Sequence, residues 1–138
     1  PAVMSSGVAA SPNIGIQEGK KGPIMSLLNA VISQGILRSA SDINIRPGKG
    51  RVHVYYRIDG KMQFVRTFHK SLLLPLISRI KIIGHMDISE RRIPQDGRFN
   101  IRVRDRSIDV RLSTMPIQNG ESVVMRLLDQ SGSALVLD

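Results

Sequence analysis

The chain has 138 residues, 41% of them hydrophobic, which predicts a single globular domain with a real core. It has no cysteine and only three scattered histidines, so a disulfide framework and a thiolate zinc site are excluded and no metal site is expected. Twenty basic against eleven acidic residues give a formal net charge of +9 at pH 7, which attracts nucleotides, nucleic acid, anionic lipid or an acidic protein surface without choosing among them.

Residues 1–22 mix small residues, glycine and proline without a helical or strand period, which predicts a flexible linker. We expect another domain upstream of such a linker in a longer protein. No apolar run approaches the roughly 20 residues needed to span a bilayer, and the N-terminus lacks the pattern of a signal peptide. We therefore expect a soluble chain without direct membrane insertion.

A helix is predicted from Pro23 onward, because apolar residues recur at helical intervals and proline suits a first turn. The apolar positions are Ile24, Leu27, Leu28, Val31, Ile32 and Leu37. After residues 39–42, Ile43 and Ile45 alternate with polar residues, which predicts a short strand that stops at Pro47.

A β-hairpin is predicted around Asp59-Gly60, because apolar and polar residues alternate on both sides and a type I′ turn needs positive φ at both central positions. His53, Tyr55 and Tyr56 could serve as a general base or a stacking platform. Aromatic residues at a period of two are, however, ordinary strand residues. The alternation therefore favours a structural role.

A second helix is predicted from Ser71, whose hydroxyl we expect to cap it, to Gly84. Its inward-facing residues are predicted to be Leu72, Leu73, Leu76, Ile77, Ile80 and Ile83. Pro75 lies early enough in this helix to be tolerated. Arg79 and Lys81 project from another side, where we expect them to join a basic surface.

Seven arginines lie between Ile88 and Arg111, around a predicted turn over residues 94–97. A guanidinium stays charged at physiological pH and presents a rigid fork of donors that fits phosphate oxygens. Such a cluster on short strands next to a turn is suited to a phosphorylated ligand. The ordinary alternative is a solvated basic face on an antiparallel sheet.

The C-terminal half continues as strands. Residues 99–104 and 108–112 alternate on either side of a turn at 105–107, and residues 120–129 supply a further apolar strand. Two helices and about six strands, mostly in hairpins, predict an α+β fold with the helices packed on an antiparallel sheet.

Five segments of the chain carry a resemblance to a known family. They are ASDINIRP (40–47), YRIDGKM (56–62), LISRIKIIGHMDISERRIPQDGRF (76–99), DVRLSTMP (109–116) and GESVVMRLLD (120–129). In this order they resemble the domain that precedes the motor in type II secretion and type IV pilus assembly ATPases. The resemblance covers residues 23–130. Asn44 and Arg46 depart from it, because the family usually has histidine and glutamate there, so no role of those two residues is carried over.

The resemblance implies that residues 23–130 are the N-terminal (N2) domain of such an ATPase, with a PAS-like α+β fold. Residues 131–138 would begin the linker to a RecA-like motor domain. The full protein would be a hexamer in the cytoplasm, peripheral to the inner membrane, with ATP and Mg as cofactors. Expected partners are the motor domain of the same or a neighbouring subunit and, through other domains, an inner-membrane platform protein. Secretion, pilus extension and a conjugative apparatus remain alternatives for the parent system.

The resemblance also assigns site residues. Arg98 in PQDGR and Arg111 in DVRLST match family arginines that reach the nucleotide phosphates when the two domains close, so both are expected to act in catalysis and in nucleotide binding. Arg91 and Arg92 are the next candidates for nucleotide contact. Ion pairs to Glu90 or Asp87 are the equal alternative for those two.

A P-loop, GxxxxGK[ST], is absent from these 138 residues. We therefore expect this chain alone neither to hydrolyse ATP nor to bind it tightly. Besides a regulatory ATPase domain, the sequence allows two other functions. One is a protein-docking module that uses the basic face. The other is sequence-independent nucleic-acid binding, which is disfavoured because no aromatic platform is expected among the arginines.

Overall fold

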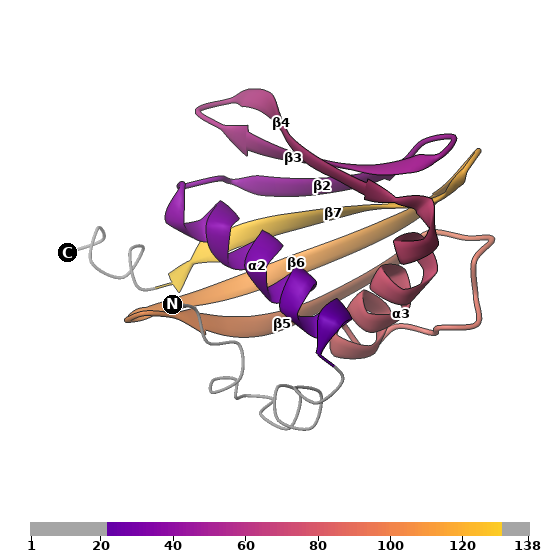
Figure 1. Ribbon diagram of the computed structural model, residues 1–138. Helices are drawn as coiled ribbons and strands as arrows, with labels where there is room; N and C mark the ends of the chain where they lie inside the picture. The colour runs from indigo at the N-terminus through magenta and orange to yellow at the C-terminus, as the bar shows by residue number, and fades with distance from the viewer. Residues whose placement is uncertain (1–21, 131–138) are drawn as a thin grey trace.

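The computed structural model describes residues 22–130, which form one six-stranded sheet and two α-helices (Figure 1). In chain order the elements are α2 (Pro23–Leu37), β2 (Asp42–Pro47), β3 (Arg51–Ile58), β4 (Lys61–His69), the 3-10 helix η1 (Lys70–Leu72), α3 (Leu73–Ile83), β5 (Gln95–Val103), β6 (Arg106–Ile117) and β7 (Gly120–Asp129). All neighbouring strands are antiparallel, in the order β4-β3-β2-β7-β6-β5. The predicted α+β fold is confirmed. The linkers predicted at 1–22 and 131–138 lie outside the described residues, apart from Gly22.

Both helices cover the same face of the sheet, and the core lies between them and that face (Figure 1). Leu28 and Ile32 of α2 and Ile80 of α3 are fully buried there. Side chains alternate between the two faces of a strand. Ile43 of β2 therefore points into the core, and Asp42 points to the opposite side. We call this opposite surface of the sheet the helix-free face.

The hairpin predicted at Asp59-Gly60 is confirmed, with φ values of 52° and 78° at the two residues. Tyr56, on the preceding strand, points into the core, and its hydroxyl donates a hydrogen bond to the carbonyl oxygen of Val31. Burial raises the pKa of Tyr56 above its ordinary value. The structural role favoured by the alternation is therefore correct for this tyrosine.

The second helix begins later than predicted. Residues Lys70–Leu72 form the 3-10 helix η1, and α3 begins at Leu73. The backbone N–H of Ser71 donates to Nδ1 of His69 at 3.0 Å. The capping group is thus the imidazole of His69, and the prediction that the Ser71 hydroxyl caps the helix is wrong. The histidine satisfies one of the backbone donors that a helix start leaves without an intrahelical partner.

The turn predicted over residues 94–97 is also wrong, because β5 begins at Gln95 and pairs with β6 from its first residue. This pairing supplies partners for backbone groups that a turn would have left exposed. Gly97 lies within the strand, where a Cβ atom would lie 2.4 Å from the carbonyl oxygen of Gly84 at the end of α3. Glycine is needed here for the close approach of two backbone segments and not for a turn.

Replacement of Gly97 by alanine is expected to destabilise the domain by about 1–3 kcal/mol, because the backbone at Gly84 must move to admit the methyl group. Urea denaturation followed by circular dichroism measures the change. Gly50→Ala is a matched control, since a Cβ there meets no atom within 4 Å. An equal free energy of unfolding for the two variants would show that β5 and α3 are not in close contact.

Candidate anion-binding site

A row of charged side chains crosses five strands on the helix-free face. Its members are neighbours in the sheet register: Arg98 of β5 lies opposite Arg111 of β6, Arg111 opposite Arg126 of β7, Arg126 opposite Asp42 of β2, and Asp42 opposite Arg57 of β3. Residues directly opposite each other in antiparallel strands have Cβ atoms about 5 Å apart. We call these five residues the charged row. It holds four guanidinium groups against one carboxylate.

Asp109 joins the two arginines that the sequence singles out. Its Oδ2 accepts a hydrogen bond from Nε of Arg111 at 3.1 Å and lies 3.5 Å from Nη2 of Arg98. The Asp109 side chain is only 3% exposed, whereas those of Arg98 and Arg111 are 63% and 50% exposed. A buried carboxylate thus orients both guanidinium groups and leaves much of each at the surface. The structure brings the two expected catalytic arginines together.

Asp42 repeats this arrangement at the other end of the charged row. Its Oδ1 accepts from Nε of Arg126 at 3.2 Å, and its Oδ2 lies 3.8 Å from Nε of Arg57. The hydroxyl of Ser41 also donates to Oδ2, at 2.9 Å. Two buried aspartates therefore each hold two arginines on the helix-free face.

Sequence reasoning misses Asp109, Asp42 and Arg126. Each occupies a polar position in an alternating strand, within DVRLST, ASDINIRP or VVMRLLD. The alternation is a signal that these side chains share one face. It carries no signal that they are neighbours across the sheet, because the pairing of β2 with β7 joins segments from opposite ends of the domain.

Arg91 and Arg92 lie in the loop before β5 and outside the charged row. Nε of Arg92 lies 3.3 Å from Oε2 of Glu90, and the backbone N–H of Arg92 donates to the same oxygen at 2.8 Å. The hydrogen bond from the Arg92 guanidinium lowers the pKa of Glu90, and the Glu90 carboxylate in turn raises the pKa of Arg92. The ion pair expected as the alternative for Arg92 is therefore present, with Glu90 as the partner, and a nucleotide contact by Arg92 stays a prediction. Arg91 is exposed on the same loop.

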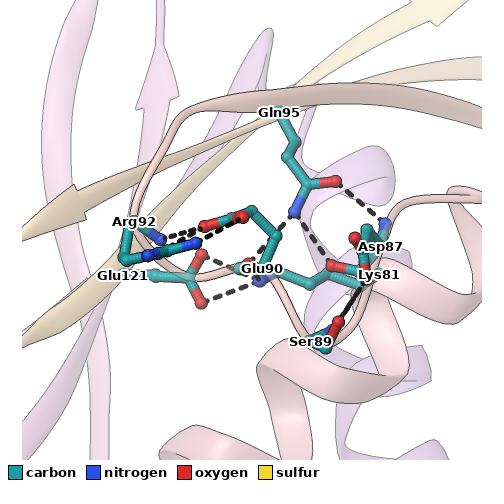
Figure 2. A network of polar contacts seen from close by, with 7 residues as sticks. All are labelled: Lys81, Asp87, Ser89, Glu90, Arg92, Gln95 and Glu121. Atoms are coloured by element: carbon teal, nitrogen blue, oxygen red, sulfur yellow. Dashed lines mark hydrogen bonds and ion pairs between the residues drawn. The ribbon is translucent and has the colours of Figure 1, made fainter.

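Lys81 ties this loop to the body of the domain (Figure 2). Its Nζ lies 2.9 Å from each carboxylate oxygen of Glu121 on β7 and donates to the carbonyl oxygen of Glu90 at 2.7 Å. The Lys81 side chain is 1% exposed. The prediction that Lys81 joins a basic surface is wrong, because Glu121 supplies a buried partner from a distant strand.

Gln95 holds the same loop from the side of β5 (Figure 2). Its Nε2 donates to the carbonyl oxygens of Asp87 at 2.9 Å and Glu90 at 3.2 Å, and its Oε1 accepts from the backbone N–H of Asp87 at 2.8 Å. The carboxylate of Asp87 accepts from the hydroxyl and the backbone N–H of Ser89, which lowers the pKa of Asp87. The loop that carries Arg92 is thus fastened to α3, β5 and β7.

Three aromatic rings lie on the helix-free face beside the charged row. Tyr55 and His53 of β3 and Phe64 of β4 have ring centroids 5.8 to 6.5 Å apart. Tyr55 lies two positions before Arg57 on the same strand. These rings lie on β3 and β4, whereas Arg98 and Arg111 lie on β5 and β6, so the rings do not interleave with these two arginines.

None of the helices in residues 22–130 is both long and apolar enough to cross a membrane. The same range contains no group of three or more histidine, aspartate or glutamate residues that could hold a metal ion.

Comparisons with known proteins match this chain to secretion proteins. Residues 17–138 match the family model described as "Type II/IV secretion system protein". The chain is 45% identical over 115 residues to "Type II secretion system protein E" of Aeromonas hydrophila, 46% over 116 residues to "Type II secretion system protein HxcR" of Pseudomonas aeruginosa, and 43% over 115 residues to "Type II secretion system ATPase E" of Vibrio cholerae. These alignments cover 83–84% of this chain and 23–25% of the relatives. The chain thus spans about a quarter of the length of the curated relatives it matches.

Proposed function

This chain belongs to the type II/IV secretion system protein family, and from that premise we propose that it is the regulatory N-terminal domain of a hexameric secretion ATPase. In this proposal the domain supplies arginines to a nucleotide that the motor domain holds. The observation that carries it is the placement of Arg98 and Arg111. They lie opposite each other, share the buried carboxylate of Asp109 and remain at least half exposed.

The chemistry of these two side chains suits phosphoryl transfer. Negative charge on the γ-phosphoryl oxygens is stabilised by guanidinium groups, and such contributions reach roughly 10³- to 10⁵-fold in rate. Asp109 holds the Arg111 guanidinium through Nε, which limits the rotamers that must be ordered when the phosphates arrive. The cofactors ATP and Mg²⁺ are assigned to the P-loop and acidic residues of the motor domain. This domain contributes the arginines.

The setting of the parent protein is part of the same proposal. It is a homo-hexamer on the cytoplasmic side of the inner membrane, and it meets an inner-membrane platform protein through other domains. The partner of the helix-free face is the motor domain of the same or a neighbouring subunit. The names of the relatives, which include a type II secretion ATPase, support the assignment of the parent protein to a secretion system.

Turnover by the parent protein tests the role of the arginines. Arg98→Ala or Arg111→Ala is expected to leave ATP binding intact and to lower hydrolysis at saturating ATP by about tenfold or more, which equals about 1.4 kcal/mol of lost transition-state stabilisation. Lysine at either position should restore little of the lost hydrolysis, because a point charge does not reproduce the guanidinium fork.

Arg102→Ala is the matched control for this test. Arg102 is exposed on the same strand and face as Arg98 but lies opposite Ser107, outside the charged row. Its removal should leave turnover unchanged. Wild-type turnover in both the Arg98 and the Arg111 variants would show that these residues form only a solvated basic face.

A docking function is the second candidate, and the loop before β5 favours it. Ile88 and Ile93 are exposed there and flank Arg91 and Arg92, so the loop presents apolar and basic groups together. Such a surface fits a neighbouring subunit in an oligomer. Loss of the hexamer with unchanged turnover per site in an Ile88→Ser/Ile93→Ser variant would assign this loop to docking.

A further inference from the structure

We propose that Arg126 is a third phosphate-contacting arginine of the helix-free face and that Asp42 is the residue that positions it. This inference rests on the proposed function, because it extends the site formed by Arg98 and Arg111. Arg126 lies opposite Arg111 on the next strand, just as Arg98 does on the other side. The Cβ atoms of the three arginines therefore lie on three adjacent strands at steps of about 5 Å.

The energetics of the row favour a ligand over a purely structural role. Like charges placed directly opposite each other destabilise a sheet. Two such pairs follow one another here, Arg98 with Arg111 and Arg111 with Arg126. Asp109 and Asp42 offset part of this repulsion, and a bound anion would offset the rest.

The way in which Arg126 is held matches Arg111. Each donates to its aspartate through Nε, at 3.2 Å for Arg126 and 3.1 Å for Arg111. Arg126 is also 66% exposed at its side chain. This anchoring leaves the terminal nitrogens of both guanidinium groups as the donors for a ligand.

Arg106 shows the contrasting, structural arrangement. Its Nε and Nη2 both contact Oδ2 of Asp129, at 2.9 and 2.8 Å, and its Nη1 donates to the carbonyl oxygen of Ile36 at 3.4 Å. All three nitrogens of that guanidinium are therefore engaged within the domain. Arg126 is held through Nε, as Arg111 is, whereas Arg106 is held through all three guanidinium nitrogens.

The site ends at Arg126. Arg57, the last member of the charged row, donates through Nη1 to the carbonyl oxygen of Gly60 at 3.0 Å, so it serves the hairpin turn. The ligand that three arginines in a line recognise is a linear polyphosphate, the chemical class of a nucleoside triphosphate's phosphate chain.

Titration of this chain with inorganic tripolyphosphate, followed by calorimetry and by the arginine Nε–Hε resonances in NMR spectra, tests the proposal. Arg126→Ala is expected to weaken binding by about fivefold, comparable to Arg98→Ala and Arg111→Ala, since each removes a charge-assisted hydrogen bond. Arg46→Ala is the control, because Arg46 is exposed on the helix-free face opposite His53, outside the row. It removes the same charge and should change the affinity by less than about twofold.

The outcomes separate the third phosphate contact, at Arg126, from the proposed function of Arg98 and Arg111. Equal effects of Arg126→Ala and Arg46→Ala, with weaker binding in the Arg98 and Arg111 variants, would overturn the third contact and leave the proposed function standing. If the Arg98 and Arg111 variants also behave like Arg46→Ala, the anion site as a whole is wrong.

Asp42→Asn tests the positioning role, because charge neutralisation and positioning predict opposite changes in the affinity for tripolyphosphate. The variant makes the chain more positive, so a carboxylate that only neutralises Arg126 would give tighter tripolyphosphate binding when removed. A carboxylate that positions Arg126 gives weaker binding, which is the expected result. Tighter binding would overturn the positioning role of Asp42.

Discussion

Ile80→Asp is expected to unfold the domain at 25 °C. Ile80 lies on the inner side of α3 and is fully buried in the core. A charged group without a partner in an apolar interior costs several kcal/mol, and the cavity left by the isoleucine adds to this cost. The total is comparable to the whole stability of a typical domain, about 5–15 kcal/mol. Far-UV circular dichroism and thermal melting measure the loss of structure.

Ile82→Asp is the control for that prediction. It makes the same substitution two residues further along α3, where the isoleucine is 43% exposed. We expect this variant to keep a cooperative melting transition. An unchanged melting temperature in the Ile80 variant would show that the inner side of α3 is wrongly assigned.

The buried ion pair between Lys81 and Glu121 gives the second large effect. Lys81→Met leaves the Glu121 carboxylate buried without its cation and the Glu90 carbonyl oxygen without its donor. Removing one partner of a buried pair costs about 3–5 kcal/mol. Chemical denaturation should report a loss of this size, and hydrogen exchange should be faster in the loop that contains Glu90.

The double variant Lys81→Met/Glu121→Leu should recover much of that stability, because replacing a buried pair with apolar side chains is often neutral. A double-mutant cycle measures the coupling between the two residues. Lys61→Met, at an exposed position on β4, serves as the control and should change the free energy of unfolding by less than about 0.5 kcal/mol. A Lys81→Met variant as stable as this control would mean that the pair does not hold the loop.

Both predictions concern neighbouring residues of one helix, and only the structure separates their roles. Ile80 follows the helical period of the apolar residues, so its burial is readable from the sequence. Lys81 lies off that period, so the sequence predicts a solvent-facing position for its side chain. Its burial depends on Glu121, 40 residues further along the chain.

Local chemistry accounts for the parts of the fold that the sequence predicts correctly. Pro23 begins α2, Asp59-Gly60 makes the hairpin, and alternating residues mark the strands. Each of these features depends on dihedral preferences or on the period of side chains along a single element. The PAS-like character of the fold stays a prediction.

The turn predicted over residues 94–97 fails for a non-local reason. Its Pro-Gln-Asp-Gly composition is typical of a turn, yet pairing with β6 draws Gln95 and Gly97 into a strand. The approach of Gly84 then explains why Gly97 is a glycine. Propensity is a weak guide where a neighbouring strand supplies the hydrogen bonds.

The sequence by itself determined that arginines and aspartates alternate with core residues, and therefore that they share one face of the sheet. Motif resemblance also identified Arg98 and Arg111. Only the tertiary structure decided which charges are neighbours, because strand register is set by turns and by packing across the whole sheet. The contact between Arg126 and Asp42 joins residues 84 positions apart. No period along a single strand can predict such a contact, and it places a third arginine beside the expected pair.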